Sequence, residues 1–72
     1  MDEYSRILIE NYCREHHSAK SRRLERLVAM SYDLSAVGTD SDAAFLENAI
    51  LQEKDEDLRE ALQDLNDFLF HW

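Results

Sequence analysis

The feature that most restricts the fold of this chain is a single glycine, Gly38, at the centre of 72 residues that contain no proline. Because glycine and proline interrupt helices most strongly, their near absence, together with abundant Leu, Ala, Glu and Arg, predicts an all-α protein. Glycine suits the left-handed position that follows a helix, and a Ser or Thr after it suits the cap of the next helix. We therefore expect a helix over about residues 2–36, a turn over about 37–40 and a helix over about 41–71.

Two such helices form an antiparallel hairpin in which residues whose numbers sum to roughly 77 lie opposite each other. This register places Ile7 near Leu65 and Leu69. It also sets the basic residues of segment 20–23 opposite the acidic run 53–57, so that apolar and charged signals agree on one register. Arms of about 30 residues predict a rod of roughly 45–50 Å, at 1.5 Å per residue.

The apolar residues of each arm do not share one helix face. At helical spacing, those around Ile7 point away from the direction of Leu24 and Leu27. Residues 16–21 provide a break, since Ser18 or Ser21 suits a helix cap, and the first arm is therefore either kinked or split there. The second arm has no comparable signal. We expect its extra apolar face to be covered by a second subunit or by a different protein, which completes a bundle.

The chain is acidic, with 16 Asp and Glu against 8 Lys and Arg and a formal net charge of −8. Residues 1–36 contain six acids and six bases, whereas residues 37–72 contain ten acids and two bases, so the second arm carries the whole excess. This charge opposes general attraction to nucleic acids and to anionic membranes. We expect neither of them to be a direct partner.

The length of 72 residues predicts one small domain, 1–72, whose own core is marginal. Cys13 is the only cysteine, which is typical of a reducing compartment. The acidic first residues do not resemble a signal peptide, and no apolar run approaches the ~18 residues of a membrane span. We expect a cytoplasmic protein.

The end of the second arm carries more large apolar side chains than one helix stripe can hold. Phe68 and Trp72 project together from a helix, whereas Phe70 points away from them. Because aromatic anchors dominate interface energetics, we interpret this excess as part of a partner-binding surface. Its candidate residues are Tyr32, Phe45, Leu58, Leu62, Leu65, Phe68, Leu69, Phe70 and Trp72. The acids expected to select a basic partner are Asp55, Glu56, Asp57, Glu60, Asp64 and Asp67.

The first arm also contains a basic cluster, made of Lys20, Arg22, Arg23 and Arg26. Few aromatic residues are interleaved with it, and no recognition-helix or zinc-finger pattern accompanies it. We expect these side chains to form salt bridges with the second arm rather than to bind phosphates.

These patterns predict a non-enzymatic protein–protein interaction module: a small acidic adaptor, chaperone-like subunit or inhibitor, acting as a homodimer or in a hetero-complex. Its expected partner is a protein with a basic surface, and masking of a nucleic-acid-binding surface is one form that this function takes. No catalytic residue, metal site or cofactor is predicted. The alternative is a metal-binding or redox-active protein built on Cys13, His16 and His17, which helical spacing places on one face. Zinc would need a further ligand, for example from a second subunit.

Overall fold

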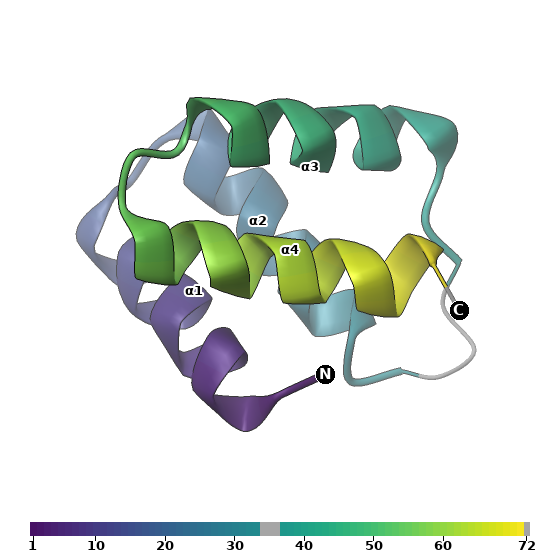
Figure 1. Ribbon diagram of the computed structural model, residues 1–72, viewed down its shortest axis with the longest axis horizontal. Helices are drawn as coiled ribbons and strands as arrows, with labels where there is room; N and C mark the ends of the chain where they lie inside the picture. Colours follow the sequence, from purple (N-terminus) through teal and green to yellow (C-terminus); the bar gives the residue numbers. More distant parts are fainter. Residues whose placement is uncertain (34–36, 72) are drawn as a thin grey trace.

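The computed structural model describes residues 1–33 and 37–71, and all secondary structure in these ranges is helical (Figure 1). Its helices are, in order, α1 (Glu3–Glu15), α2 (Ala19–Met30), α3 (Asp40–Gln52) and α4 (Glu56–Phe70). The predicted all-α class is confirmed for the described residues. The hairpin of two long helices is not confirmed, because each arm is divided into two helices.

The four helices pack into a short bundle rather than a rod. The Cα atoms extend over 28 × 22 × 21 Å, well below the roughly 45–50 Å expected for two unbroken arms. Helix α1 packs against α2 and α4, and α3 packs against α4. Figure 1 shows α3 and α4 side by side, with α2 behind them. None of the helices in the described part of the chain has the length and apolar character needed to cross a membrane.

The break between α1 and α2 follows from local hydrogen bonding at Ser18. The Ser18 hydroxyl accepts a hydrogen bond from the Ser21 backbone N–H at 3.1 Å, and the Ser21 hydroxyl accepts one from the Ser18 N–H at 2.9 Å. This reciprocal capping box satisfies two donors that a helix start leaves without a partner. Of the two forms left open for the first arm, kinked or split near Ser18, the structure shows the split.

The break between α3 and α4 corrects the expectation of one long helix over the second arm. Helix α3 ends at Gln52, and Glu53 has the extended backbone angles φ −77° and ψ 128°. The Asp55 carboxylate then caps α4 by accepting a hydrogen bond from the Leu58 N–H at 3.1 Å. An Asp within an acidic run was sufficient as a helix start, although no glycine or proline marks the position.

The connection between α2 and α3 differs from the turn that the sequence suggested. Helix α2 ends at Met30, well before position 36, and residues 34–36 lie outside the described range. The φ angle of Gly38 is not positive, so this glycine does not occupy the expected left-handed position. Thr39 caps α3 instead, and its hydroxyl accepts a hydrogen bond from the Asp42 N–H at 3.2 Å.

The hydrophobic core lies where the four helices meet. Helices α1 and α4 pack together as the hairpin register required, but Ile9 rather than Ile7 fills the core: Ile9 is completely buried and Ile7 is 47% exposed. The buried apolar residues are Ile9, Cys13, Leu24, Leu27, Val28, Leu46, Ala49, Leu58, Ala61, Leu62 and Leu65. Once the second arm is folded back at Glu53, both of its halves contribute to this core, and no second subunit is needed to cover α4.

Candidate protein-interaction surface

Three of the aliphatic residues assigned to partner binding are core residues. Leu62 and Leu65 are completely buried, and Leu58 is 8% exposed. In this structure they are part of the core and do not present a surface to a partner. The physical reason is the bend before α4, which places this apolar stripe of α4 between α1 and α3.

The candidate residues Phe45 of α3 and Phe68, Leu69 and Phe70 at the end of α4 are half-buried rather than exposed. Phe45, Leu69 and Phe70 pack against the core, and Phe68 is also half-buried. The Arg23 guanidinium lies 4.5 Å from the centre of the Phe45 ring, which it covers. Trp72 lies outside the described residues.

Among the candidate aromatics that the structure describes, only Tyr32 is widely exposed, at 62%. Its hydroxyl donates a hydrogen bond to Glu10 Oε1 at 2.8 Å, and the Arg6 guanidinium lies 4.7 Å from its ring centre. The hydrogen bond to the carboxylate raises the pKa of Tyr32, because it favours the protonated phenol. Tyr32 thus packs on α1 through these two contacts.

The acids of α4 form the most continuous charged surface. Four of the candidate acids, Glu56, Asp57, Glu60 and Asp67, are exposed and make no ion pair or side-chain hydrogen bond with the described residues. Glu56 and Asp57 are adjacent, and the others, with Asp64, follow at intervals of three or four residues, so all five share the side of α4 that faces away from the core. We call these five residues the acidic face of α4.

The two remaining acids of the candidate set, Asp64 and Asp55, make contacts within the protein. Asp64 Oδ2 accepts a hydrogen bond from the Asp2 N–H at 3.0 Å, which ties the start of the chain to α4. Asp55 is the N-cap of α4 and belongs to the helix start rather than to the acidic face.

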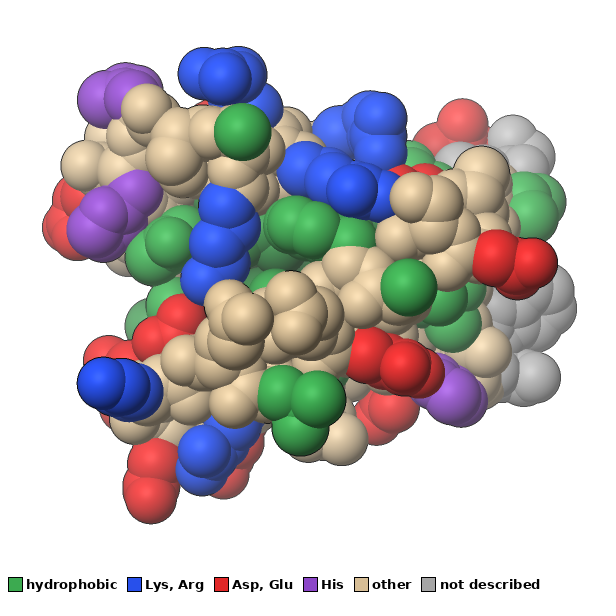
Figure 2. Space-filling model, turned by 90° about the horizontal axis from the view of Figure 1, so that it is seen from above, with side chains coloured by type: hydrophobic (Ala, Val, Ile, Leu, Met, Phe, Trp, Pro, Cys, Tyr) green, Lys and Arg blue, Asp and Glu red, His purple; other side chains and the backbone are tan. Residues whose placement is uncertain are grey.

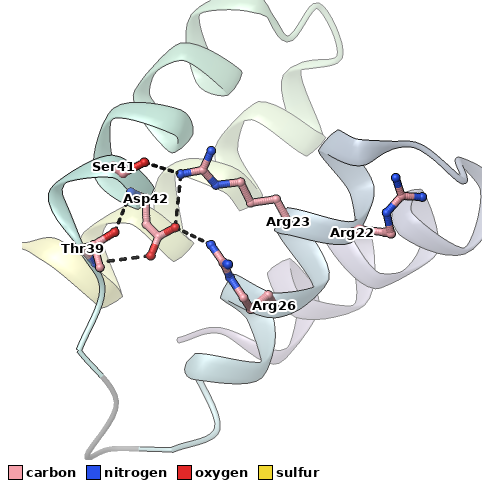
Figure 3. A pocket seen from close by; sticks show the side chains of 6 residues that line it. All are labelled: Arg22, Arg23, Arg26, Thr39, Ser41 and Asp42. Carbon is pink, nitrogen blue, oxygen red and sulfur yellow. Dashed lines mark hydrogen bonds and ion pairs between the residues drawn. The ribbon is translucent and has the colours of Figure 1, made fainter.

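The basic cluster of α2 is partly neutralised within the fold, as Figure 3 shows. Arg26 Nη2 lies 2.7 Å and Arg23 Nη2 3.4 Å from Asp42 Oδ1, while Arg23 also donates to the Ser41 hydroxyl at 2.8 Å. Burial by itself would raise the pKa of Asp42. The net effect is nevertheless a lower pKa, because Thr39 and Arg23 donate hydrogen bonds to the carboxylate and Arg26 adds a positive charge. The carboxylate therefore acts as an internal counter-ion for two arginines.

The expected salt bridges to the second arm exist, with different partners. Lys20 Nζ lies 3.8 Å from Glu53 Oε1, which confirms one predicted pair. Arg23 and Arg26 pair with Asp42 instead of the acidic run 53–57. Arg22 has no ion-pair partner among the described residues. In Figure 2, blue side chains gather along one edge of this face of the molecule, and further blue side chains lie at the opposite edge.

The alternative site of Cys13, His16 and His17 does not come together as a metal centre. Cys13 is buried and its thiol donates a hydrogen bond to the Ser21 carbonyl oxygen at 3.3 Å, whereas both histidines are exposed. Burial and the charges of Glu25 and Glu10 raise the pKa of Cys13 to about 11, which disfavours the thiolate that binds metals and attacks substrates. Over the described residues, no group of three or more His, Cys, Asp or Glu side chains is placed to hold a metal ion.

A hollow between α3 and α4 was missed by the sequence analysis. It is lined by Glu47, Ile50, Leu51, Gln63 and Asn66. Two signals were available: Asn66 interrupts the apolar stripe between Leu62 and Leu69, and Leu51 lies off the apolar face of its helix. Comparisons of this chain with protein-family models, with curated proteins and with solved structures found no match.

Proposed function

We propose that this protein is a non-enzymatic interaction module that binds a basic protein surface through the acidic face of α4. The observation that carries the proposal is a difference between two charged helices. The bases of α2 are partly paired with Asp42 and Glu53, whereas four acids of α4 make no ion pair with the described residues. We propose that these four acids contact the partner.

Electrostatics supports this use of α4. Like charges on one helix face repel each other by a few tenths of a kcal/mol per pair, and a basic partner relieves that repulsion. Complementary charge also accelerates encounter and rejects acidic competitors. Because two acidic faces repel each other, we favour a hetero-complex over a homodimer that uses this face.

Whether the protein acts as an inhibitor or as an adaptor depends on which kind of basic surface it binds. A stripe of carboxylates has the same sign of charge as a nucleic-acid backbone and competes with it for Lys and Arg side chains. We therefore propose an inhibitor or adaptor that covers a basic surface of a cytoplasmic protein, and a nucleic-acid-binding surface is the most informative case to test.

The experiment compares two triple variants that remove the same number of acids. The first, D57N/E60Q/D67N, neutralises the acidic face of α4. The matched control, E3Q/E15Q/E25Q, neutralises acids of α1 and α2, and each triple includes one acid from a first helical turn. Proteins captured from the host are identified by mass spectrometry for the wild type and for both variants, over a range of salt concentrations.

The expected result is a basic protein that the wild type and the control variant capture and the α4 variant loses, with capture that weakens as salt rises. Equal capture by both variants, or retention of the partner at high salt by the α4 variant, contradicts the proposal. Circular dichroism confirms that both variants remain folded before capture is compared.

A further inference from the structure

The hollow between α3 and α4 lies next to the acidic face of α4. It has a volume of about 330 Å³, with Ile50 and Leu51 on the α3 side and Gln63 and Asn66 on the α4 side. Glu60 and Asp67 lie three and four residues from Gln63, so they share its side of α4. The hollow and the acidic face therefore form one continuous surface.

Asn66 marks this hollow as unusual. The residue is 6% exposed, and its Oδ1 atom has no hydrogen-bond partner in the described part of the protein. A buried polar atom without a partner costs free energy, and nearly all such atoms in native proteins have one. Asn66 lines the hollow, but its Oδ1 atom is enclosed, so a donor that enters there supplies the missing hydrogen bond only when the Asn66 side chain turns toward it.

The α3 wall of the hollow is apolar and accessible. Leu51 is 84% exposed, the highest value among the large hydrophobic residues of the described chain, and the neighbouring Ile50 is half-buried. Glu47, one turn before Leu51, is exposed and makes no ion pair with the described residues. An occupant thus meets an aliphatic wall and a carboxylate, with the buried amide of Asn66 beside them.

We infer that this hollow binds an arginine side chain from a basic segment of the partner protein. The aliphatic stem packs on Ile50 and Leu51, and the guanidinium donates a hydrogen bond to the Glu47 carboxylate and, once the Asn66 side chain has turned, a second one to Asn66 Oδ1. Arginine fits better than lysine because its fork of five donors can serve two acceptors at once. The inference rests on the proposed function for the class of partner, and it adds the side chain that is recognised and the place where it binds.

A second copy of this chain is a poorer occupant. The part of the chain that forms α3 and α4 carries the whole net charge of −8, with ten acids and two bases over residues 37–72. A symmetric contact through this face would bring two acidic surfaces together, and that arrangement is unfavourable.

The test is a titration of the isotope-labelled protein, followed by nuclear magnetic resonance, with three capped tripeptides: Ala-Arg-Ala, Ala-Lys-Ala and the uncharged Ala-citrulline-Ala. We expect the arginine peptide to shift the Asn66 side-chain amide and the Ile50 and Leu51 methyl signals in a saturable manner. The lysine peptide is expected to bind more weakly and the citrulline peptide more weakly still.

Two variants make the test specific. N66L removes the acceptor with little change in volume, and it should weaken the arginine peptide roughly tenfold, which corresponds to one hydrogen bond to a charged group. N48L is the control, because Asn48 is an exposed α3 residue outside the hollow, and it should leave binding unchanged. The thermal unfolding temperature of N66L should be no lower than that of the wild type, since the substitution removes an unsatisfied polar atom.

The outcomes separate this inference from the proposed function. Shifts confined to Glu56, Asp57, Glu60 and Asp67 overturn the arginine site and leave the acidic face of α4 as the binding surface. Binding of the citrulline or lysine peptide as tight as that of the arginine peptide overturns the assignment of arginine. If the signals of the hollow residues shift when the protein is concentrated without any peptide, the arginine site is overturned and a second copy of this chain is the occupant.

Discussion

The backbone of Gly38 lies directly against the ring of Phe70. A Cβ atom at Gly38 would be 2.5 Å from the Cζ atom of Phe70, and it would meet Cε1 as well. The contact joins the segment before α3 to the last residue of α4, and it brings together two residues far apart in the sequence. Glycine is therefore needed here for space, and not for a left-handed backbone.

We predict that Gly38→Ala destabilises the protein by roughly 1–3 kcal/mol, the usual cost of forcing extra volume into a packed site. Because the obstacle is a ring at the end of α4, Phe70→Leu in the same chain should recover most of the loss. Urea unfolding of the two single variants and the double variant measures this coupling. Additive losses would show that the glycine is required for another reason.

Asp42 provides a pH-dependent prediction. Asp42→Asn should cost about 1–3 kcal/mol near neutral pH, because it weakens charge-assisted hydrogen bonds with Arg23 and Arg26. The pKa of Asp42 in the folded protein is lower than its ordinary value of 3.8, so the carboxylate stabilises the fold fully above pH 3.8. That stabilisation is lost as the pH falls through the lower folded-state pKa.

The measurement for Asp42 is the free energy of unfolding of wild type and variant at neutral pH and at about pH 3, where the difference should narrow. Asp40→Asn is the matched control, because Asp40 lies in the same first turn of α3 but is exposed. A loss for Asp42→Asn that stays constant with pH would show that the charge is not responsible.

The start of α4 depends on the side chain of Asp55. We predict that Asp55→Ala lowers stability by about 1 kcal/mol, since it removes the acceptor for the Leu58 N–H. Asp55→Ser keeps an acceptor without the charge and should be close to the wild type. Thermal unfolding compares the three proteins. If Ser is as destabilising as Ala, the effect of Asp55 arises from its charge rather than from capping.

Cys13 should react slowly in the folded protein. The rise in its pKa from 9.0 to about 11 lowers the thiolate fraction about a hundredfold at mildly alkaline pH, and burial slows access further. Mass spectrometry after iodoacetamide treatment should show little alkylation of the native protein and rapid alkylation in urea. Rapid alkylation of the native state would support the redox-active alternative.

Local signals in the sequence were sufficient for part of this structure. The helical class, the cap at Ser18 and the concentration of acids in the second arm depend on residues that are neighbours in the chain, and all three can be predicted without the tertiary structure. The break at Glu53 is also local, but an Asp within an acidic run is a weak signal, and a continuous helix was an equally consistent prediction.

The choice of buried face was not available from the sequence. Ile7 and Ile9 are both apolar, yet Ile9 is buried and Ile7 half exposed, because the helices that cover α1 are brought there by bends elsewhere in the chain. The same bends bury Leu58, Leu62 and Leu65, which a straight second arm would have left for a partner.

The sequence by itself thus determined the helical class, the break near Ser18 and the place of the charge, since these depend on hydrogen bonds and side chains within a few residues of one another. Only the tertiary structure decided that Gly38 gives room to Phe70, that Asp42 pairs with Arg23 and Arg26, and that Asn66 lacks a partner. Each of these relationships joins different helices or loops. Their geometry is set by how the helices pack, which no local pattern of residues specifies.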